Sequence, residues 1–378
     1  MQTLKRLAVS FLFSILVFSL GMIPVRAEKQ SVWIGTGATG IYHLEFDDET
    51  GKLSDPTLAA EIRGPGFLTA TDDGKRLYSV GNVDDESSVA SFDIGKGGKL
   101  EFINAQPIGD GGAAHLSLDR RGRALLTAQY GAGSVAAFPI DAKGAIEPRS
   151  ALIKHDGGSK IDGRRQTRPH PHWAGTSPDN QFAFIPDLGL DQVVVYRLTE
   201  NPVGLEPHTT GQVPAGAGPR HMKFHPNGKF IYVLNELALS LSVFAYDAAT
   251  GKMSLLATVP TLDDATKAGE AFNAASEIRV HPSGKFLYTA NRGHDTISVF
   301  SVSPDGSTVK RVEVEPIRGA WPRNFNLDLT GRWLLAAGSH SNTVAVFRVD
   351  EETGKLMYDR QIVNVPSPMC VLFTRDAN

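Results

Sequence analysis

Cysteine is nearly absent from this 378-residue chain, which has a single one at Cys370. An internal disulfide framework and a cysteine-rich zinc module are therefore excluded. The chain also lacks an excess of charge of either sign, because 38 basic residues stand against 41 acidic ones for a net charge of −3. This balance argues against a nucleic-acid-binding protein and against a basic protein of membrane surfaces. We therefore predict that nucleic acid is not a partner.

Long apolar runs are missing as well, with one exception near the N-terminus. Lys5 and Arg6 precede the apolar stretch 7–21, and a Val-Arg-Ala sequence at 25–27 places small residues at the −3 and −1 positions of a cleavage site. This order is typical of a secretory signal peptide over residues 1–27. An uncleaved anchor is the alternative, but the stretch is short for a span of roughly 20 residues. We predict a mature chain of residues 28–378, periplasmic or secreted, with no membrane attachment after cleavage.

Glycine and proline are plentiful, with 38 and 22 residues, and they favour many tight turns. A strand–turn–strand unit recurs six times with a period of about 46–58 residues. Its first strand and turn occupy 66–74, 114–122, 172–180, 220–228, 276–284 and 323–331. Short alternating runs bounded by Gly, Asp, Asn and Pro are typical of antiparallel strands, and each unit holds four of them.

The repeat count predicts seven units, although only six are complete. Segment 369–373 adds one more inner strand, and segments 31–34, 40–44 and 50–53 supply the rest of that unit. Packing four-stranded units radially buries both faces of each, and joining the chain ends in one blade removes the open edge. We therefore predict an all-β fold, a single seven-bladed β-propeller domain closed by the N- and C-terminal strands in one blade. Two β-sandwiches would leave the repeat unexplained.

Residues found in one unit only are candidates for function, because scaffold residues recur in every unit. At the start of the first strand the large polar exceptions are His172, Arg220 and Arg323, and the one acid after a second strand is Glu236. Arg279 lies three residues into the first strand of the fifth complete unit. We expect His172, Arg220, Glu236 and Arg279 to converge at one channel mouth on a pocket for a small anionic molecule.

Some of these features have a structural alternative. An Arg–Glu pair in a propeller channel can be an ion pair that bridges blades. His225-Pro226 and His281-Pro282 occupy the same turn of two units, so we interpret them as scaffold. His170 and His172 instead follow a long loop, 154–169, and long loops over the end of a scaffold tend to carry binding residues. A His-x-His pair can also hold a metal, but no third ligand is evident, so no metal is predicted.

Several motifs make the likeness to a known family specific. They are Arg165-Gln166 ahead of Pro169-His170-Pro171-His172, the segment 186–191, Gly218-Pro219-Arg220-His221 followed by Asn235-Glu236, Ser276-Glu277-Ile278-Arg279, and Pro322-Arg323-Asn324-Phe325. Over about residues 31–373 the chain resembles the seven-bladed propeller lactonases, typified by propeller-type 6-phosphogluconolactonase and carboxy-cis,cis-muconate cyclase. The resemblance implies a catalytic set of His172, Arg220, Glu236 and Arg279. The predicted substrate-binding residues are Arg165, Gln166, His170, His221, Glu277 and Arg323.

The activity implied by the resemblance is hydrolysis of a sugar-acid lactone by a monomer without a cofactor. The partner is then a small-molecule lactone or an anionic sugar acid. We expect Glu236 to act as general base and His172 as acid, with the reverse assignment open, while the arginines hold the oxyanion and an anionic group. No Gly-x-Ser-x-Gly sequence is present, which disfavours a covalent serine route. A lactonizing cyclase and a non-enzymatic binding propeller of the cell envelope are the alternatives.

Overall fold

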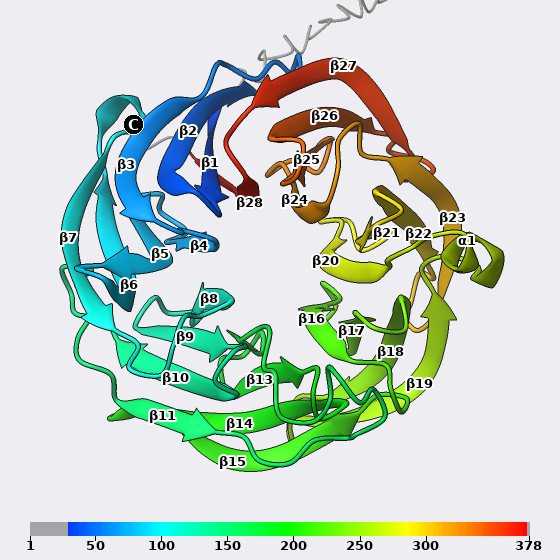
Figure 1. The fold of residues 1–378 in the computed structure, drawn as a ribbon, viewed down its shortest axis with the longest axis horizontal. Coiled ribbons are helices and arrows are strands. Elements are labelled where there is room, and N and C mark those ends of the chain that lie inside the picture. Colours follow the sequence, from blue (N-terminus) through cyan, green and yellow to red (C-terminus); the bar gives the residue numbers. More distant parts are fainter. Residues whose placement is uncertain (1–28, 376–378) are drawn as a thin grey trace, which may run out of the picture.

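Four-stranded antiparallel sheets radiate from a central channel in the computed structural model, which describes residues 29–375 (Figure 1). Five sheets are separate, and an eight-stranded sheet combines two blades through one pairing, Arg63 with Asn82. The prediction of a seven-bladed propeller is therefore confirmed. The recurring turn glycine has a conformational reason, since Gly228 and Gly284 have φ of +70° and +73°. In the third blade Asn180 replaces it with φ +62°, a conformation that asparagine tolerates.

The strands follow one another blade by blade. The first three blades consist of β4 (Leu68–Ala70), β5 (Arg76–Val83), β6 (Glu86–Ile94) and β7 (Leu100–Pro107); β8 (His115–Leu118), β9 (Ala124–Gln129), β10 (Ser134–Pro139) and β11 (Ala151–Lys154); and β12 (Gly175–Thr176), β13 (Phe182–Asp187), β14 (Gln192–Glu200) and β15 (Val203–Gln212). The next three consist of β16 (Pro219–Phe224), β17 (Phe230–Asn235), β18 (Ser240–Asp247) and β19 (Lys252–Pro260); β20 (Ala274–Val280), β21 (Phe286–Arg292), β22 (Thr296–Val302) and β23 (Val309–Pro316); and β24 (Pro322–Leu327), β25 (Trp333–Gly338), β26 (Thr343–Val349) and β27 (Leu356–Asn364). The seventh combines β28 (Pro368–Arg375), β1 (Lys29–Thr36), β2 (Thr39–Asp47) and β3 (Thr57–Arg63). Two short helices, η1 (Lys96–Gly98) and α1 (Asp264–Ala268), lie in connections.

The two ends of the chain close the ring as predicted. β28 runs antiparallel to β1, with Ser31 opposite Thr374 and Ile34 opposite Val371. The indole of Trp33, fully buried, donates from Nε1 to Thr374 Oγ1 at 2.9 Å. The expected cleavage site at 25–27 lies outside the described residues. Within residues 29–375, no helix has the length and apolar character that a membrane span requires.

The core consists of apolar layers between neighbouring blades. One cluster joins β1 of the closing blade to the first two blades, and it contains Trp33, Leu77 and Phe138. Another lies between the sixth blade and the closing one and contains Val32 and Leu335. These side chains have no exposed surface, and each large one contributes roughly 1.5–3 kcal/mol by burial. Stability is thus distributed around the ring, and the channel side is left for polar residues.

Turn residues that recur also tie each blade to the next. His225 Nε2 lies 3.2 Å from the carbonyl oxygen of Gly284, and His281 Nε2 lies 3.0 Å from that of Gly331. The interpretation of the two His-Pro turns as scaffold is therefore confirmed. These contacts lie in the turns after the inner strands, so the opposite ends of those strands are free to build a site.

Candidate active site

Glu236 collects three arginine side chains at one mouth of the channel. In blade four, β16 and β17 run antiparallel with Pro219 opposite Asn235, so the residues after these, Arg220 and Glu236, meet at the same end. Arg220 Nε lies 3.0 Å from Glu236 Oε2. Arg292, the last residue of β21, and Arg165, in the loop before blade three, place Nη2 atoms 3.1 and 2.8 Å from Oε1. One carboxylate therefore connects three separate parts of the chain.

The charges around Glu236 decide its protonation. Its side chain is 3% exposed, and burial alone would raise its pKa. The charges of Arg292, Arg220 and Arg165 outweigh burial and lower the pKa to about 2. Such a carboxylate is a weak base at neutral pH, because proton transfer is most effective when the pKa lies near the working pH. Glu236 is suited to holding arginines rather than to abstracting a proton.

Arg165 reaches the site from the long loop between β11 and β12. Its Nε and Nη2 donate to the hydroxyl of Tyr130 at 3.1 and 2.8 Å, beside its contact with Glu236. The ring of His170 stacks on Tyr130 with centroids 4.3 Å apart, and its Nδ1 contacts the carbonyl oxygen of Tyr130 at 2.8 Å. His170 therefore supports the Tyr130–Arg165 pair from behind.

Gln166 fixes the loop that carries Arg165. It is fully buried, and its Nε2 donates to Leu188 O at 2.9 Å and to Asp191 Oδ1 at 2.6 Å. The same Asp191 oxygen accepts from the backbone N–H of Gly218 at 2.8 Å. The amide nitrogen of Gln166 is thus occupied by protein groups, and the residue lies behind the site.

His172 is a buried imidazole with one ring nitrogen, Nδ1, that has no hydrogen-bond partner among the described residues. It is 5% exposed, and its Nδ1 is a buried atom without a partner. Burial and then the charge of Arg220 hold the pKa of His172 well below its usual value. Its ring lies against those of Tyr130 and His221, with centroids 5.3 and 5.2 Å away. A neutral imidazole with a free nitrogen is an available proton acceptor.

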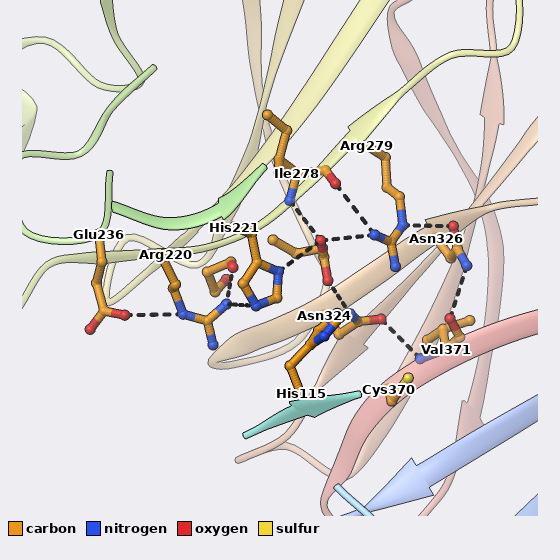
Figure 2. Close-up of polar contacts among 12 residues, drawn as sticks. His115, Arg220, His221, Glu236, Ile278, Arg279, Asn324, Asn326, Cys370 and Val371 are labelled. Atoms are coloured by element: carbon orange, nitrogen blue, oxygen red, sulfur yellow. Dashed lines mark hydrogen bonds and ion pairs between the residues drawn. The ribbon is translucent and has the colours of Figure 1, made fainter. Parts of the chain in front are cut away.

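Arg279 does not join the group around Glu236. Its Nη1 donates to Glu277 Oε1 at 2.9 Å and its Nε to Asn326 Oδ1 at 2.8 Å, at a deeper level of the channel. Figure 2 shows Glu236 and Arg220 at one end of the network and Arg279 and Asn326 at the other. Of the four residues expected to converge, Arg220 and Glu236 contact each other. His172 lies against His221, the residue that follows Arg220. Arg279 lies apart from them.

A small cavity opens beside these groups. It has a volume of about 130 Å³, and its polar lining comprises Arg220, His221 and Arg323. The facing wall carries Gly66, Phe67 and other small or apolar residues of the first, second and closing blades. The guanidinium of Arg323 has no ion pair or hydrogen bond to any residue in 29–375 and lines the cavity, so it is available to a ligand. Within the same residues, no group of three or more His, Cys, Asp or Glu side chains is placed to hold a metal ion.

Comparisons with known proteins agree with this architecture. Residues 31–373 match a family model described as lactonase, 7-bladed beta-propeller. The chain belongs to this family. It is 35% identical to 6-phosphogluconolactonase of Bacillus subtilis over 90% of this chain and 97% of that protein, and 33% identical to 6-phosphogluconolactonase of Formosa agariphila over 84% and 90%. The solved periplasmic gluconolactonase of Pseudomonas aeruginosa superimposes with a TM-score of 0.84 at 29% identity, over 92% of this chain and 99% of that one.

Two site residues of this lactonase-family propeller were not selected from the sequence. Arg292 and Tyr130 stand at the same repeat position as Glu236, at the end of a second strand, and both contact the site through Glu236 or Arg165. The signal was present, because that position differs from blade to blade. The acid at this position also indicates them, because a buried carboxylate at a channel mouth requires cations from its neighbours.

Proposed function

We propose that this protein is a lactonase that hydrolyses the ester of a sugar-acid lactone. The observation that carries the proposal is a neutral imidazole with an unpartnered Nδ1, His172, packed against His221, which lines a cavity together with Arg220 and Arg323. The names of the relatives support the same chemistry, since two are called 6-phosphogluconolactonase and one gluconolactonase.

The roles we assign differ from the expected ones, because His172 serves as both base and acid and Glu236 transfers no proton. His172 takes a proton from the attacking water, because its Nδ1 has no partner, whereas both oxygens of Glu236 are engaged by arginines and its pKa is about 2. The water oxygen bonds to the lactone carbonyl carbon, and Arg220 and Arg323 stabilise the oxyanion. The ring C–O bond then breaks, and the protonated His172 donates its proton to the leaving alkoxide. The products are the open hydroxy acid, which ionises, and the neutral imidazole.

Glu236 contributes by holding the arginines in place. Each of Arg165, Arg220 and Arg292 lies within 3.1 Å of its carboxylate oxygens, so their mutual repulsion is balanced. The cations outnumber this one carboxylate, and that excess favours a substrate or product with an anionic group.

We also propose that the protein is exported. The signal-like segment 1–27 supports this, and the similar Pseudomonas aeruginosa protein is described as periplasmic. An exported lactonase seldom meets sugar phosphates, so the comparison of phosphorylated and unphosphorylated lactones decides the substrate.

The test is a panel of sugar and hydroxy-acid lactones, with and without phosphate, assayed on the purified mature chain. We expect saturable hydrolysis of at least one lactone. His172→Asn should lower its kcat by roughly 10²–10⁴-fold, the range for loss of a general base. His208→Asn is the matched control, since His208 lies on the outer strand β15 with its Nε2 on Thr250 O at 2.7 Å. No hydrolysis of any lactone, or an unchanged kcat in folded His172→Asn, would contradict the proposal.

A further inference from the structure

A second buried carboxylate, Glu277, is not used by the proposed chemistry. It has no exposed surface, and four groups donate to it. Oε1 accepts from His221 Nδ1 at 3.1 Å, from Arg279 Nη1 at 2.9 Å and from the backbone N–H of Ile278 at 2.9 Å, and Oε2 accepts from Asn324 Nδ2. Both oxygens accept from protein groups and the side chain has no exposed surface, so Glu277 does not contact a substrate. Glu277 must act on the site through a neighbour.

That neighbour is His221, whose two ring nitrogens face groups of opposite kind. Glu277 accepts a hydrogen bond from Nδ1 of His221, so this nitrogen carries the proton. Arg220 Nη1 lies 3.1 Å from Nε2, and a guanidinium can only donate. Nε2 must therefore be unprotonated and accepting. The carboxylate on one side and the guanidinium on the other select a single tautomer of a neutral His221.

Arg220 is held from two sides by this arrangement. It is 2% exposed, its Nε pairs with Glu236, and its Nη1 contacts His221 and the carbonyl oxygen of Ser276. Its Nη2 has no hydrogen bond or ion pair to any residue in 29–375, and Arg220 lines the cavity. Figure 2 shows the continuous run from Glu236 through Arg220 and His221 toward the deeper network. The orientation of the free N–H groups thus depends on Glu236, on the carbonyl oxygen of Ser276 and on the Nε2 atom of His221.

We propose that Glu277 is a positioning residue that, through the Nδ1–H tautomer of His221, aims the free edge of Arg220 into the cavity. The part of this inference that concerns catalysis rests on the proposed lactonase function. The part that concerns geometry does not. If His221 carried its proton on Nε2, two donors would face each other, and Arg220 would lose one of its three contacts. A misplacement of about 1 Å is enough to cost roughly 10²-fold in rate.

Two substitutions of His221 separate positioning from a general loss of structure. His221→Leu keeps an apolar body and removes both nitrogens, so we expect kcat/KM for the best lactone to fall about 10²-fold. His221→Gln supplies an amide that donates from nitrogen to Glu277 and accepts on oxygen from Arg220, so we expect activity within about fivefold of wild type. Asn326→Ala is the control for damage to the deep network, because Asn326 contacts Arg279 and the closing strand but not His221. It should lower the melting temperature without changing kcat/KM.

Nitrogen-15 NMR gives a readout that does not depend on turnover. We expect the His221 ring to show the Nδ1–H tautomer in the wild type and a mixture in Glu277→Gln. The Arg220 Nε–H signal should be sharp in the wild type and in His221→Gln, and broadened or shifted in His221→Leu. An Nε2–H tautomer in the wild type, or an unperturbed Arg220 signal in folded His221→Leu, overturns the inference. Equal activity losses in His221→Leu and His221→Gln overturn it too. If the NMR results are as expected but no lactone is hydrolysed, the proposed function is rejected and the inference about the geometry stands.

Discussion

Replacing Glu236 by glutamine separates a structural role of this carboxylate from a catalytic one. The change keeps the shape of the side chain but removes the negative charge that three arginines share. Arg220 and Arg292 are 2% and 6% exposed, so neither can turn into solvent, whereas Arg165 at 34% can relax. Glu236→Gln therefore leaves two buried cations without a counter-charge.

The loss in the free energy of unfolding caused by Glu236→Gln follows from two separate quantities. Removing one partner of a buried ion pair costs about 3–5 kcal/mol. A glutamate whose pKa is 4.5 when unfolded and about 2 when folded contributes about 3 kcal/mol at neutral pH. Because the folded pKa is the lower one, this stability is present above about pH 4.5 and is lost as the pH falls toward 2. At about 2 °C per kcal/mol for a chain of this size, the melting temperature should fall by about 6 °C or more.

The assay combines melting temperature with kinetics on the best lactone. We expect Glu236→Gln to melt lower, to lose about 10²-fold in kcat/KM through displaced arginines, and to keep the pH profile of the wild type, because His172 is still the base. Added chloride should raise its melting temperature more than that of the wild type, since an anion replaces the lost charge. Glu200→Gln, on the exposed pair with Arg121, is the matched control and should change little.

One pattern of results would instead make Glu236 the base. If folded Glu236→Gln melts within 1–2 °C of the wild type, keeps its KM and loses roughly 10²–10⁴-fold in kcat, Glu236 is the base and the arginines do not depend on it. Loss of the acid limb from the pH profile of this variant would point the same way.

Three further predictions concern the pH profile, the closure of the ring and export. Because burial and then Arg220 lower the pKa of His172, and because a base must be unprotonated, kcat/KM should stay constant from pH 8 to about 6.5 and fall only at lower pH; an acid limb above pH 7 would exclude His172 as the base. Deletion of residues 366–378 removes β28 together with its bonds to β1, so thermal unfolding should show a loss of several kcal/mol, and unchanged unfolding would mean that the closure contributes nothing. The intact mass of protein from the cell envelope should correspond to a chain beginning at Glu28, and a mass that includes residues 1–27 would show that the segment is retained.

The fold was predictable because the sequence repeats. Six copies of one strand–turn–strand pattern specify the strand pairing within a blade, and the incomplete copies at the two ends predict that Ser31–Ile34 pairs with the strand near Val371. The same repetition identified His225 and His281 as scaffold, and both contact the turn of the following blade. Strand four was harder to place from the sequence, because its residues are half-exposed and alternate weakly, as in β19 and β27.

The sequence predicts where in each blade the site residues stand, but it does not predict which side chains they contact. The repeat shows that residues 220 and 236 reach one channel mouth, and their charged atoms lie 3.0 Å apart. It cannot show how far along the inner strand a long side chain extends. Arg279 and Arg292 belong to the same blade and carry the same charge, yet they differ in depth. Arg279 bonds to Glu277 and Asn326 inside the channel, whereas Arg292 ends β21 at the rim and reaches Glu236 at 3.1 Å.

The carboxylate present at each depth of the channel determines which of these two arginines forms an ion pair there. The channel holds two buried glutamates, Glu236 at the rim and Glu277 below it, and each is surrounded by donors. A buried carboxylate is stable only when cations are close to it. Each glutamate therefore pairs with the arginine whose backbone lies at the same depth in the channel. His221, between the two levels, contacts Glu277 directly and reaches Glu236 through Arg220. The two charge clusters are therefore connected by one imidazole, and the aim of Arg220 into the cavity depends on both.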